Sequence, residues 1–227
     1  MTTLVMHRLV RAFIPEHSGL RRTIHRFVFE RNLRKLNDLF VRRGVDDRFW
    51  LSGGLLLGWA RQGGILPNDY KDADFGLRSD DCGIFCALVP DLIAGGFLPF
   101  RRFRDNDGRT TLWSFWKDGS QFDFIEYRTE EASRWFTGYF DFDGASWQVI
   151  GKVPDGPLER ISFLGRWWWK PGDHQAELAA LYGDWEVPWD EASKGHAWNT
   201  GRDSPAIVER VAWLSAEMSW DGSCDGV

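Results

Sequence analysis

The sequence predicts one α+β domain with helical segments at both ends, and three observations lead to that fold class. The 227 residues are enough to enclose one hydrophobic core. Apolar residues make up 43% and charged residues 27%, which is typical of a soluble globular protein. Helical periodicity occurs near both ends, strand-like alternation fills the middle, and neither a repeat nor a linker divides the chain.

Five segments have the periodicity or the capping residues of helices: residues 23–43, 55–61, 79–93, 173–182 and 205–218. Gly44 suits the position that follows the first helix. Ser79 suits the N-cap of the third helix, which Pro90 is expected to bend or divide. Ser204 and Pro205 suit the cap and the first turn of the last helix.

Seven short apolar or alternating segments are predicted to be strands: residues 49–52, 73–77, 98–103, 111–116, 121–127, 135–142 and 147–153. Asp143-Gly144 marks a hairpin between the last two. Strands between helices at both ends complete the α+β interpretation.

The net charge of −5 is unevenly distributed along the chain. Residues 1–43 contain ten Lys or Arg and three Asp or Glu, a charge of +7, so the remainder carries −12. An acidic body disfavours general nucleic-acid binding, because it repels phosphate backbones. The basic segment is interpreted as a solvated helix face, with docking on an anionic membrane, polymer or partner as the alternative.

We expect a cytoplasmic protein without a membrane span. No run of 18 apolar residues occurs, and Arg8 and Arg11 interrupt any signal-peptide core. Cys82 and Cys86 are four residues apart without partner ligands, which disfavours zinc. These two and Cys224 are therefore expected to be buried reduced thiols.

Three Asp-x-Asp pairs occur, about as many as chance predicts, and one differs from the others in its context. The pairs that begin at Asp105 and Asp141 run into glycine and are interpreted as turns. Asp72 and Asp74 instead open an apolar strand, where a spacing of two places both carboxylates on one face. Their repulsion is roughly 3 kcal/mol at ~5 Å, which a bound Mg²⁺ or Mn²⁺ would offset. Pairing with water, Lys71 or Arg78 remains the alternative.

Asp123 is predicted to be the third ligand of this metal site. The alternation of residues 121–126 places Asp123 and Ile125 on one strand face and Glu126 on the other. An acid between aromatic residues on a central strand is costly without a partner. Asp123 is therefore preferred to Glu126 as the residue that joins Asp72 and Asp74.

Ser52-Gly53-Gly54 lies where a strand turns into a helix, which suits a phosphate site. Glycine lets the backbone approach a ligand closely, and a helix N-terminus offers free N–H groups. Arg61, further along that helix, is within reach of a phosphate, although a surface salt bridge is the alternative.

These segments together resemble the LicD/fukutin family of phosphotransferases, which have the nucleotidyltransferase fold. The resemblance rests on a Gly-Gly-x-Leu-Leu-Gly-x-x-Arg pattern with clustered aspartates after it, and on a Tyr-Gly-x-x-Trp-x-x-Pro closing motif. The matching residues are 50–67, Asp69, Asp72, Asp74, Gly76 and 181–188. The resemblance implies a mixed sheet flanked by helices. It also implies three regions: a basic helical segment packed on the core (1–45), a catalytic domain (46–200), and a C-terminal helix and tail (201–227).

The resemblance further implies transfer of a phospho-alcohol, such as phosphocholine or ribitol phosphate, from a CDP-linked donor to a glycan hydroxyl. Asp72 and Asp74 carry over as ligands of Mg²⁺ or Mn²⁺, with Asp123 as the third, and either Asp123 or Asp69 accepts the proton of the acceptor hydroxyl. The residues assigned to donor phosphate are Ser52, Gly53, Gly54, Arg61 and Lys71.

Two other functions use the same motifs: nucleotidyl transfer to a small molecule or protein, and silent binding of glycans or nucleotides. Trp167-Trp168-Trp169 offers a sugar-stacking platform, although alternation assigns at least one of the three to the core. His174 and His196 have no nucleophile or carboxylate at a spacing that would indicate catalysis, and they are interpreted as surface or capping residues. The transferase interpretation also places the protein in the cytoplasm, at the inner face of the membrane if the basic segment docks there.

Overall fold

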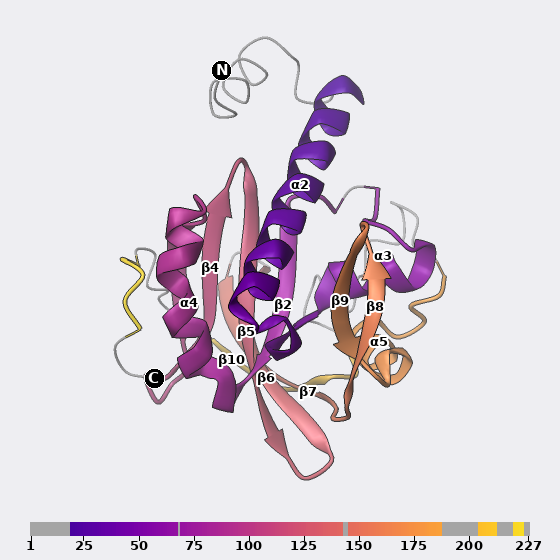
Figure 1. Ribbon diagram of the computed structural model, residues 1–227. Helices are drawn as coiled ribbons and strands as arrows, with labels where there is room; N and C mark the ends of the chain where they lie inside the picture. The colour runs from indigo at the N-terminus through magenta and orange to yellow at the C-terminus, as the bar shows by residue number, and fades with distance from the viewer. Residues whose placement is uncertain (1–18, 68, 143–144, 188–203, 213–219, 225–227) are drawn as a thin grey trace.

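The computed structural model describes residues 19–67, 69–142, 145–187, 204–212 and 220–224. Its main element is an eight-stranded mixed sheet, which Figure 1 shows. Along one path the strands are β1 (Phe49–Leu51), β2 (Asp72–Arg78), β5 (Ser120–Glu130), β6 (Ser133–Phe142), β7 (Ala145–Pro154) and β10 (Ile207–Ala212). β4 (Thr110–Lys117) pairs with β5, and β3 (Leu98–Arg104) pairs with β4. β2 and β5 are parallel, whereas the other strand pairs of this sheet are antiparallel.

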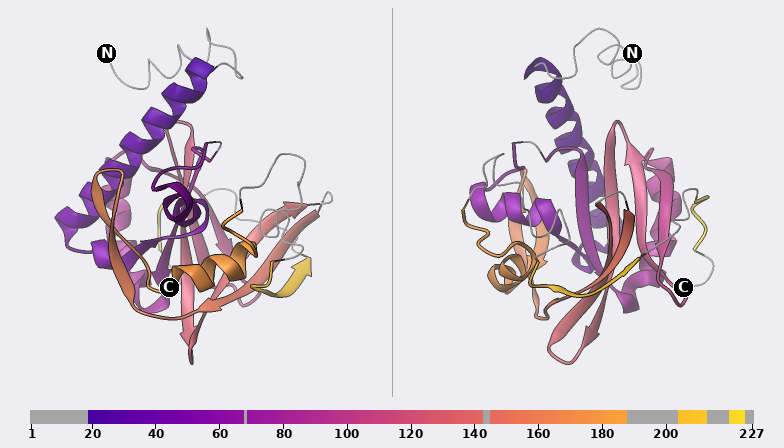
Figure 2. Two further views of the ribbon diagram at one scale, coloured as in Figure 1. Left: turned by 90° about the vertical axis from the view of Figure 1, so that its right-hand side faces the viewer. Right: turned by 180° about the vertical axis from the view of Figure 1, so that it is seen from behind.

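Helices cover the sheet, so the predicted α+β class is confirmed. α2 (Gly19–Arg43) and α4 (Cys82–Ala94) lie across one face in Figure 1. Phe40 from α2 and Phe85 from α4 both contact Phe124 on β5, with ring centroids 6.3 and 4.8 Å away. α3 (Gly53–Gln62) and α5 (His174–Tyr182) lie beside the sheet, as the two views of Figure 2 show. The core therefore fills the space between the sheet and α2 and α4.

A separate hairpin of β8 (Leu158–Phe163) and β9 (Arg166–Pro171) was not predicted from the sequence. Trp168 on β9 is buried and stacks on Phe75 of β2 at 5.7 Å, whereas Trp167 is 55% exposed. Asn37 of α2 donates to the carbonyl of Trp167 at 2.7 Å. The alternation expected for the tryptophan run is thus present, and it fixes this hairpin against the core.

The predicted helix over residues 205–218 is wrong for the part of it that the structure describes. Residues Ile207–Ala212 form β10, which pairs antiparallel with β7. Ser204 donates to the carbonyl of Ala180, and its hydroxyl accepts from the N–H of Ala206, so it caps a turn into the strand. Three β-branched residues, Ile207, Val208 and Val211, suit an extended segment on an open sheet edge. Residues 213–218 of that prediction lie outside the described residues.

α4 runs unbroken from Cys82 to Ala94 with Pro90 inside it, and a 3-10 turn, η2 (Ser79–Asp81), precedes it. The expectation of reduced cysteines is wrong for two of the three. Cys86 on α4 forms a disulfide with Cys224, whereas Cys82 is free and buried. Only the fold brings together cysteines that are 138 positions apart in the chain.

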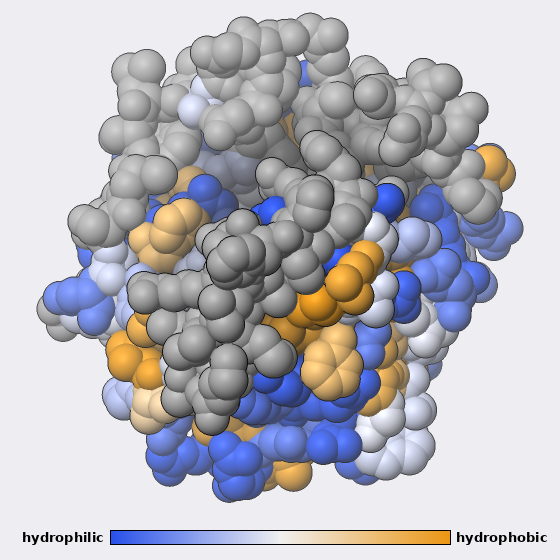
Figure 3. All heavy atoms as spheres, turned by 90° about the horizontal axis from the view of Figure 1, so that it is seen from above, coloured by the Kyte–Doolittle hydropathy of each residue, from blue (hydrophilic) through white to orange (hydrophobic). Residues whose placement is uncertain are grey.

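The basic segment is described only from Gly19 onward, as part of α2. Arg26 and Arg34 both pair with Glu30, and Arg31 pairs with Asp118 in the β4–β5 turn. Part of the positive charge is therefore balanced within the protein. None of the described helices has the length and apolar character that crossing a membrane requires. In Figure 3, apolar side chains of the described residues appear as patches among hydrophilic ones.

Candidate metal centre

The strand register brings three aspartates together at the start of β2 and β5. In this parallel pair Asp74 lies opposite Asp123, and Asp72 lies opposite Gln121. Carboxylate oxygens of Asp72, Asp74 and Asp123 all lie within 4.8 Å of one another. The sequence-predicted trio therefore forms one cluster, which is exposed at Asp72 and buried at Asp123.

The cluster holds more negative charge than its own side chains can balance. Burial, followed by the charges of Asp72, Asp123 and Asp69, holds the pKa of Asp74 well above its ordinary value. The pKa of Asp72 is raised in the same way by the protein atoms that displace water from its carboxyl and by the charges of Asp123 and Asp69, although the residue as a whole is exposed. The three carboxylates therefore resist being charged together, and a further positive charge beside them would relieve that repulsion.

One oxygen of Asp123 has no hydrogen-bond partner, which is what a cation site requires. Gln121 donates from Nε2 to Oδ2 of Asp123 at 2.8 Å. Oδ1 is buried and has no partner among the described residues. A buried carboxylate oxygen without a partner is costly, and hard oxygen ligands suit Mg²⁺ or Mn²⁺. The residues present therefore fit the divalent cation that the family resemblance implies.

The two glycines let the start of α3 lie directly against this cluster. Gly53 has a φ of +52°, and a Cβ there would overlap the carboxylate of Asp74. A Cβ on Gly54 would overlap Oδ2 of Asp69. The N–H of Gly54 donates to Asp74 and favours its charged form. The glycines thus bring the positive end of a helix to the acids, and their predicted contact with donor phosphate stays a prediction.

Ser52 is buried, and its hydroxyl bonds a protein partner. Its Oγ lies 3.1 Å from the hydroxyl of Tyr127, and its N–H donates to the carbonyl of Asp74. These two bonds anchor Ser52, and with it the start of α3, to β2 and β5. Arg134 in turn lies over the rings of Trp50 and Tyr127 and donates to Glu177 of α5.

Of the two cations assigned to donor phosphate, Arg61 bonds the closing motif and Lys71 lies at the surface. The Nε of Arg61 donates to the carbonyl of Trp185, and its Nη2 donates to that of Val187 at 3.0 Å. The guanidinium thus holds the closing motif beside α3. Lys71 is exposed, and its carbonyl accepts the N–H of Gln121. Donor contacts by Arg61 and Lys71 stay predictions.

Asp69 lies beside the cluster, outside the set of three. It is half-buried, and burial raises its pKa to about 6. Tyr182, in the closing motif, is close enough to be influenced by Asp74, Asp69 and Arg61. The closing motif, over a hundred residues later in the chain, thus folds back onto the metal centre.

Arg101 is a site residue that sequence reasoning missed. Across β3, β4 and β5, Arg101 lies opposite Ser114, which lies opposite Asp123. Burial raises the pKa of Asp72 and Asp123, and the positive charge of Arg101 offsets part of that rise. The guanidinium lies over the ring of Phe103 at 4.9 Å, and Nε approaches Oγ of Ser114 at 3.4 Å. Strand alternation alone gives no signal for it, because its position depends on the strand order.

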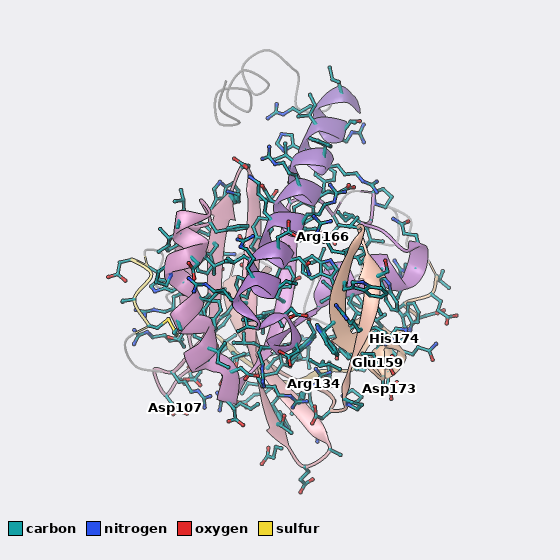
Figure 4. The ribbon with its side chains drawn as sticks, in the orientation of Figure 1. Asp107, Arg134, Glu159, Arg166, Asp173 and His174 are labelled. Carbon is teal, nitrogen blue, oxygen red and sulfur yellow. A yellow bond between two sulfur atoms is a disulfide. The ribbon has the colours of Figure 1, made fainter. Side chains whose placement is uncertain are left out.

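The remaining candidates lie elsewhere. Glu126 accepts from Arg109 and from the hydroxyl of Ser79, on the opposite face of β5 from Asp123. Asp105 closes the predicted turn, accepting from the N–H of Arg109 at 2.9 Å. Figure 4 labels His174 and Asp173 together at the start of α5, where Asp173 caps the helix. His174 packs edge-on against Trp59, and His196 lies outside the described residues.

The comparisons with known proteins agree with this geometry. The profile of the LicD/FKTN/FKRP nucleotidyltransferase domain matches residues 46–173, from η1 (Asp46–Arg48) to the cap of α5. No curated protein matches the chain significantly. The matched region contains β1, the α3 glycines, the three aspartates and Arg101, and it exceeds half of the chain. The protein belongs to the LicD/FKTN/FKRP family, a phosphotransferase-like family with a nucleotidyltransferase domain.

Proposed function

We propose that this protein is a metal-dependent phosphotransferase that moves a phospho-alcohol from a CDP-linked donor to a glycan hydroxyl. The observation that carries the proposal is the convergence of Asp72, Asp74 and Asp123, with a buried oxygen of Asp123 left unpaired. Membership of the LicD/FKTN/FKRP family supports transfer of a phosphorus-containing group. Transfer of a phospho-alcohol from a CDP-linked donor to a glycan acceptor is one specific reaction of that general kind.

Asp72, Asp74 and Asp123 would hold Mg²⁺ or Mn²⁺. Bound there, the cation supplies positive charge for donor phosphate oxygens and for the charge that develops on the leaving nucleotide. The N–H of Gly54 favours the charged form of Asp74, and Gln121 orients Asp123 through Oδ2. The roles of these residues are thus to hold and orient the carboxylates.

Arg101 is the cation best suited to the donor phosphates. Its charge acts on Asp72 and Asp123. Among the described residues its one hydrogen bond uses Nε, which leaves both Nη groups for phosphate oxygens. A guanidinium that stacks on Phe103 is held in a fixed plane, which suits bidentate binding. Arg61, by contrast, donates from Nε to the carbonyl of Trp185 and from Nη2 to the carbonyl of Val187.

Asp69 is the better candidate for accepting the proton of the acceptor hydroxyl. Asp123 belongs to the cluster of three, whereas Asp69 lies beside it against Gly54. A carboxylate that is not tied to the cation is free to take a proton. Asp69 is therefore assigned the role of base, and the three clustered aspartates the role of ligands.

The test is to incubate the protein with a panel of CDP-alcohols and glycan acceptors, in Mg²⁺ and in EDTA, and to measure CMP release. CMP release that requires the metal and the acceptor supports the proposal. Release of pyrophosphate from CTP or ATP, with a nucleotide attached to the acceptor, would instead identify a nucleotidyltransferase. No metal-dependent donor binding would identify a silent binding module.

A further inference from the structure

A hollow lies on the sheet face opposite the metal centre. It has a volume of about 300 Å³ and spans β5, β6 and β7 beside the β3–β4 turn. Glu126 and Arg128 line it from β5, and strand alternation places both on the opposite face from Asp123. Asp107, which also lines it, appears in Figure 4 at the lower left, across the view from His174. The hollow is therefore separate from the aspartate cluster.

Two buried polar atoms on residues that line this hollow have no hydrogen-bond partner. Oε1 of Gln148 accepts no hydrogen bond, and Gln148 is only 2% exposed. Nε1 of Trp135 is likewise buried and donates to no partner. Buried polar groups are nearly always paired, and each unpaired one costs roughly 1–3 kcal/mol. One unpaired acceptor and one unpaired donor point to a ligand that can both donate and accept.

The charges around the hollow argue against an anionic ligand. Four carboxylates line it, and Arg128 is the single cation among the described residues of its lining. That cation is already paired with Asp105 at 2.8 Å and with Glu126 at 3.7 Å. The acids Asp107 and Glu130 stay exposed at its rim. Phosphate or a nucleotide would bring its negative charge against these carboxylates and would be repelled.

A cationic ligand fits the unpaired atoms no better. Lys152 lies over the ring of Trp135 with Nζ 4.8 Å from the centroid, so this ring already has a cation partner. A simple alkylammonium ion also has no acceptor to offer the N–H of Trp135. A neutral hydroxyl-bearing ring meets both needs, because each hydroxyl donates and accepts. Its apolar faces would match Trp135, Phe136 and Ile150, which also line the hollow.

We propose that this hollow binds one neutral sugar ring, at a site distinct from the metal centre. The volume is at the lower end of small-molecule pockets, about 300–1,000 Å³, and suits a single ring. Gln148 accepts from one ring hydroxyl, Trp135 donates to another, and the rim acids Asp107 and Glu130 accept from those that remain. The proposal is independent of the transfer reaction, because it needs neither donor nor cation.

The experiment measures binding of methyl glycosides of glucose, galactose, mannose and N-acetylglucosamine to the full chain, without donor or divalent ion. Saturation-transfer NMR identifies the sugar, and calorimetry gives its affinity. Trp135→Phe keeps the ring and removes the donor, and Gln148→Leu removes the acceptor. Each is expected to weaken binding roughly tenfold. Gln148→Leu also removes the hydrogen bond between the Gln148 side chain and Tyr139, so the Tm of this variant is measured alongside its affinity.

Trp59→Phe is the matched control. Trp59 also has a cation over its ring, Lys170 with Nζ 5.6 Å from the centroid, but it lies outside the hollow. Its substitution should leave sugar binding unchanged. The proposal is overturned if none of the sugars binds, or if Trp135→Phe and Gln148→Leu both leave the affinity unchanged. It is equally overturned if tetramethylammonium or inorganic phosphate binds there in place of sugar. If Gln148→Leu does not fold, Trp135→Phe decides alone.

Discussion

Asp74 on β2 and Asp123 on β5 lie directly opposite each other in a pair of parallel strands. The register turns two acids that are 49 positions apart in the sequence numbering into neighbours. With Asp72 on the same face as Asp74, it also concentrates three carboxylates at the edge of a hydrophobic core. Substitutions of Asp74, Arg101 and Gly54 test whether this arrangement binds a divalent cation and a donor phosphate.

Replacing Asp74 with Asn should abolish turnover while the fold survives. The substitution removes one ligand and one crowded carboxylate, so the Tm in EDTA should rise, and the Tm increase that Mg²⁺ produces should disappear. Activity and thermal unfolding, each with and without Mg²⁺, provide the measurement. Asp80→Asn is the control, because Asp80 is exposed in the η2 turn. Near-normal activity of Asp74→Asn would refute the metal assignment.

Arg101→Met should act in opposite directions on the donor and on the cation. Loss of a charge-assisted contact to phosphate should raise the KM for the donor by about tenfold or more. Affinity for Mg²⁺ should rise, since a positive charge near Asp72 and Asp123 is removed. Donor kinetics and metal titration separate the two effects. Arg104→Met, an exposed position on the same strand, should change neither.

Gly54→Ala should disable the site, whereas Gly83→Ala should not. A methyl group on Gly54 would overlap Asp69, so α3 or the carboxylate must shift, and we expect at least a tenfold loss of activity. Gly83, near the start of α4, is exposed with open space around it. Alanine there should stabilise the helix by about 0.5–1 kcal/mol. Equal activity of the two variants would show that the close approach of α3 to Asp69 is dispensable.

Thiol titration of the unfolded, unreduced protein should detect one free thiol. The chain has three cysteines, and a disulfide between Cys86 and Cys224 leaves Cys82. Reduction should lower the free energy of unfolding by about 2–4 kcal/mol, because the disulfide constrains the unfolded chain. Cys224→Ser should show the same loss and become insensitive to reductant. Three titrated thiols would restore the original expectation of reduced cysteines.

Glu177 should make stability fall as the pH rises from about 4.5 to 7. Burial, which outweighs the charge and hydrogen bond of Arg134, raises the pKa of Glu177 from its ordinary value of 4.5 to about 7. In this window the folded state retains a proton that the unfolded state releases, so the free energy of unfolding decreases by up to about 3 kcal/mol and then levels off.

Glu177→Gln removes this titration. The free energy of unfolding of the variant, measured with urea at several pH values, should therefore vary less between pH 4.5 and 7 than that of the wild type. Glu159→Gln, at an exposed carboxylate on β8, should leave the wild-type pH dependence nearly unchanged, since salt bridges at exposed sites contribute little. Parallel pH profiles of wild type and Glu177→Gln would contradict the assignment.

Local patterns in the sequence were sufficient for most elements and for the identity of the metal-centre aspartates. Apolar periodicity located α2, and alternation located β5, because the two elements differ in the spacing of the residues that they bury. The context of Asp72 and Asp74 on an apolar strand separated them from the turn at Asp105, which the structure contains as predicted. Alternation also assigned Asp123 to the face of this pair.

Only the tertiary structure decided the features that depend on contacts between distant segments. Residues 207–212 have capping residues before them that favour a helix, yet the open edge of β7 pairs with them as β10. Arg101 joins the site through three strands in register, and Arg61 is turned to the closing motif. Cys86 meets Cys224 for the same reason. Periodicity reports which face of an element is buried, whereas strand order and packing determine what that face meets.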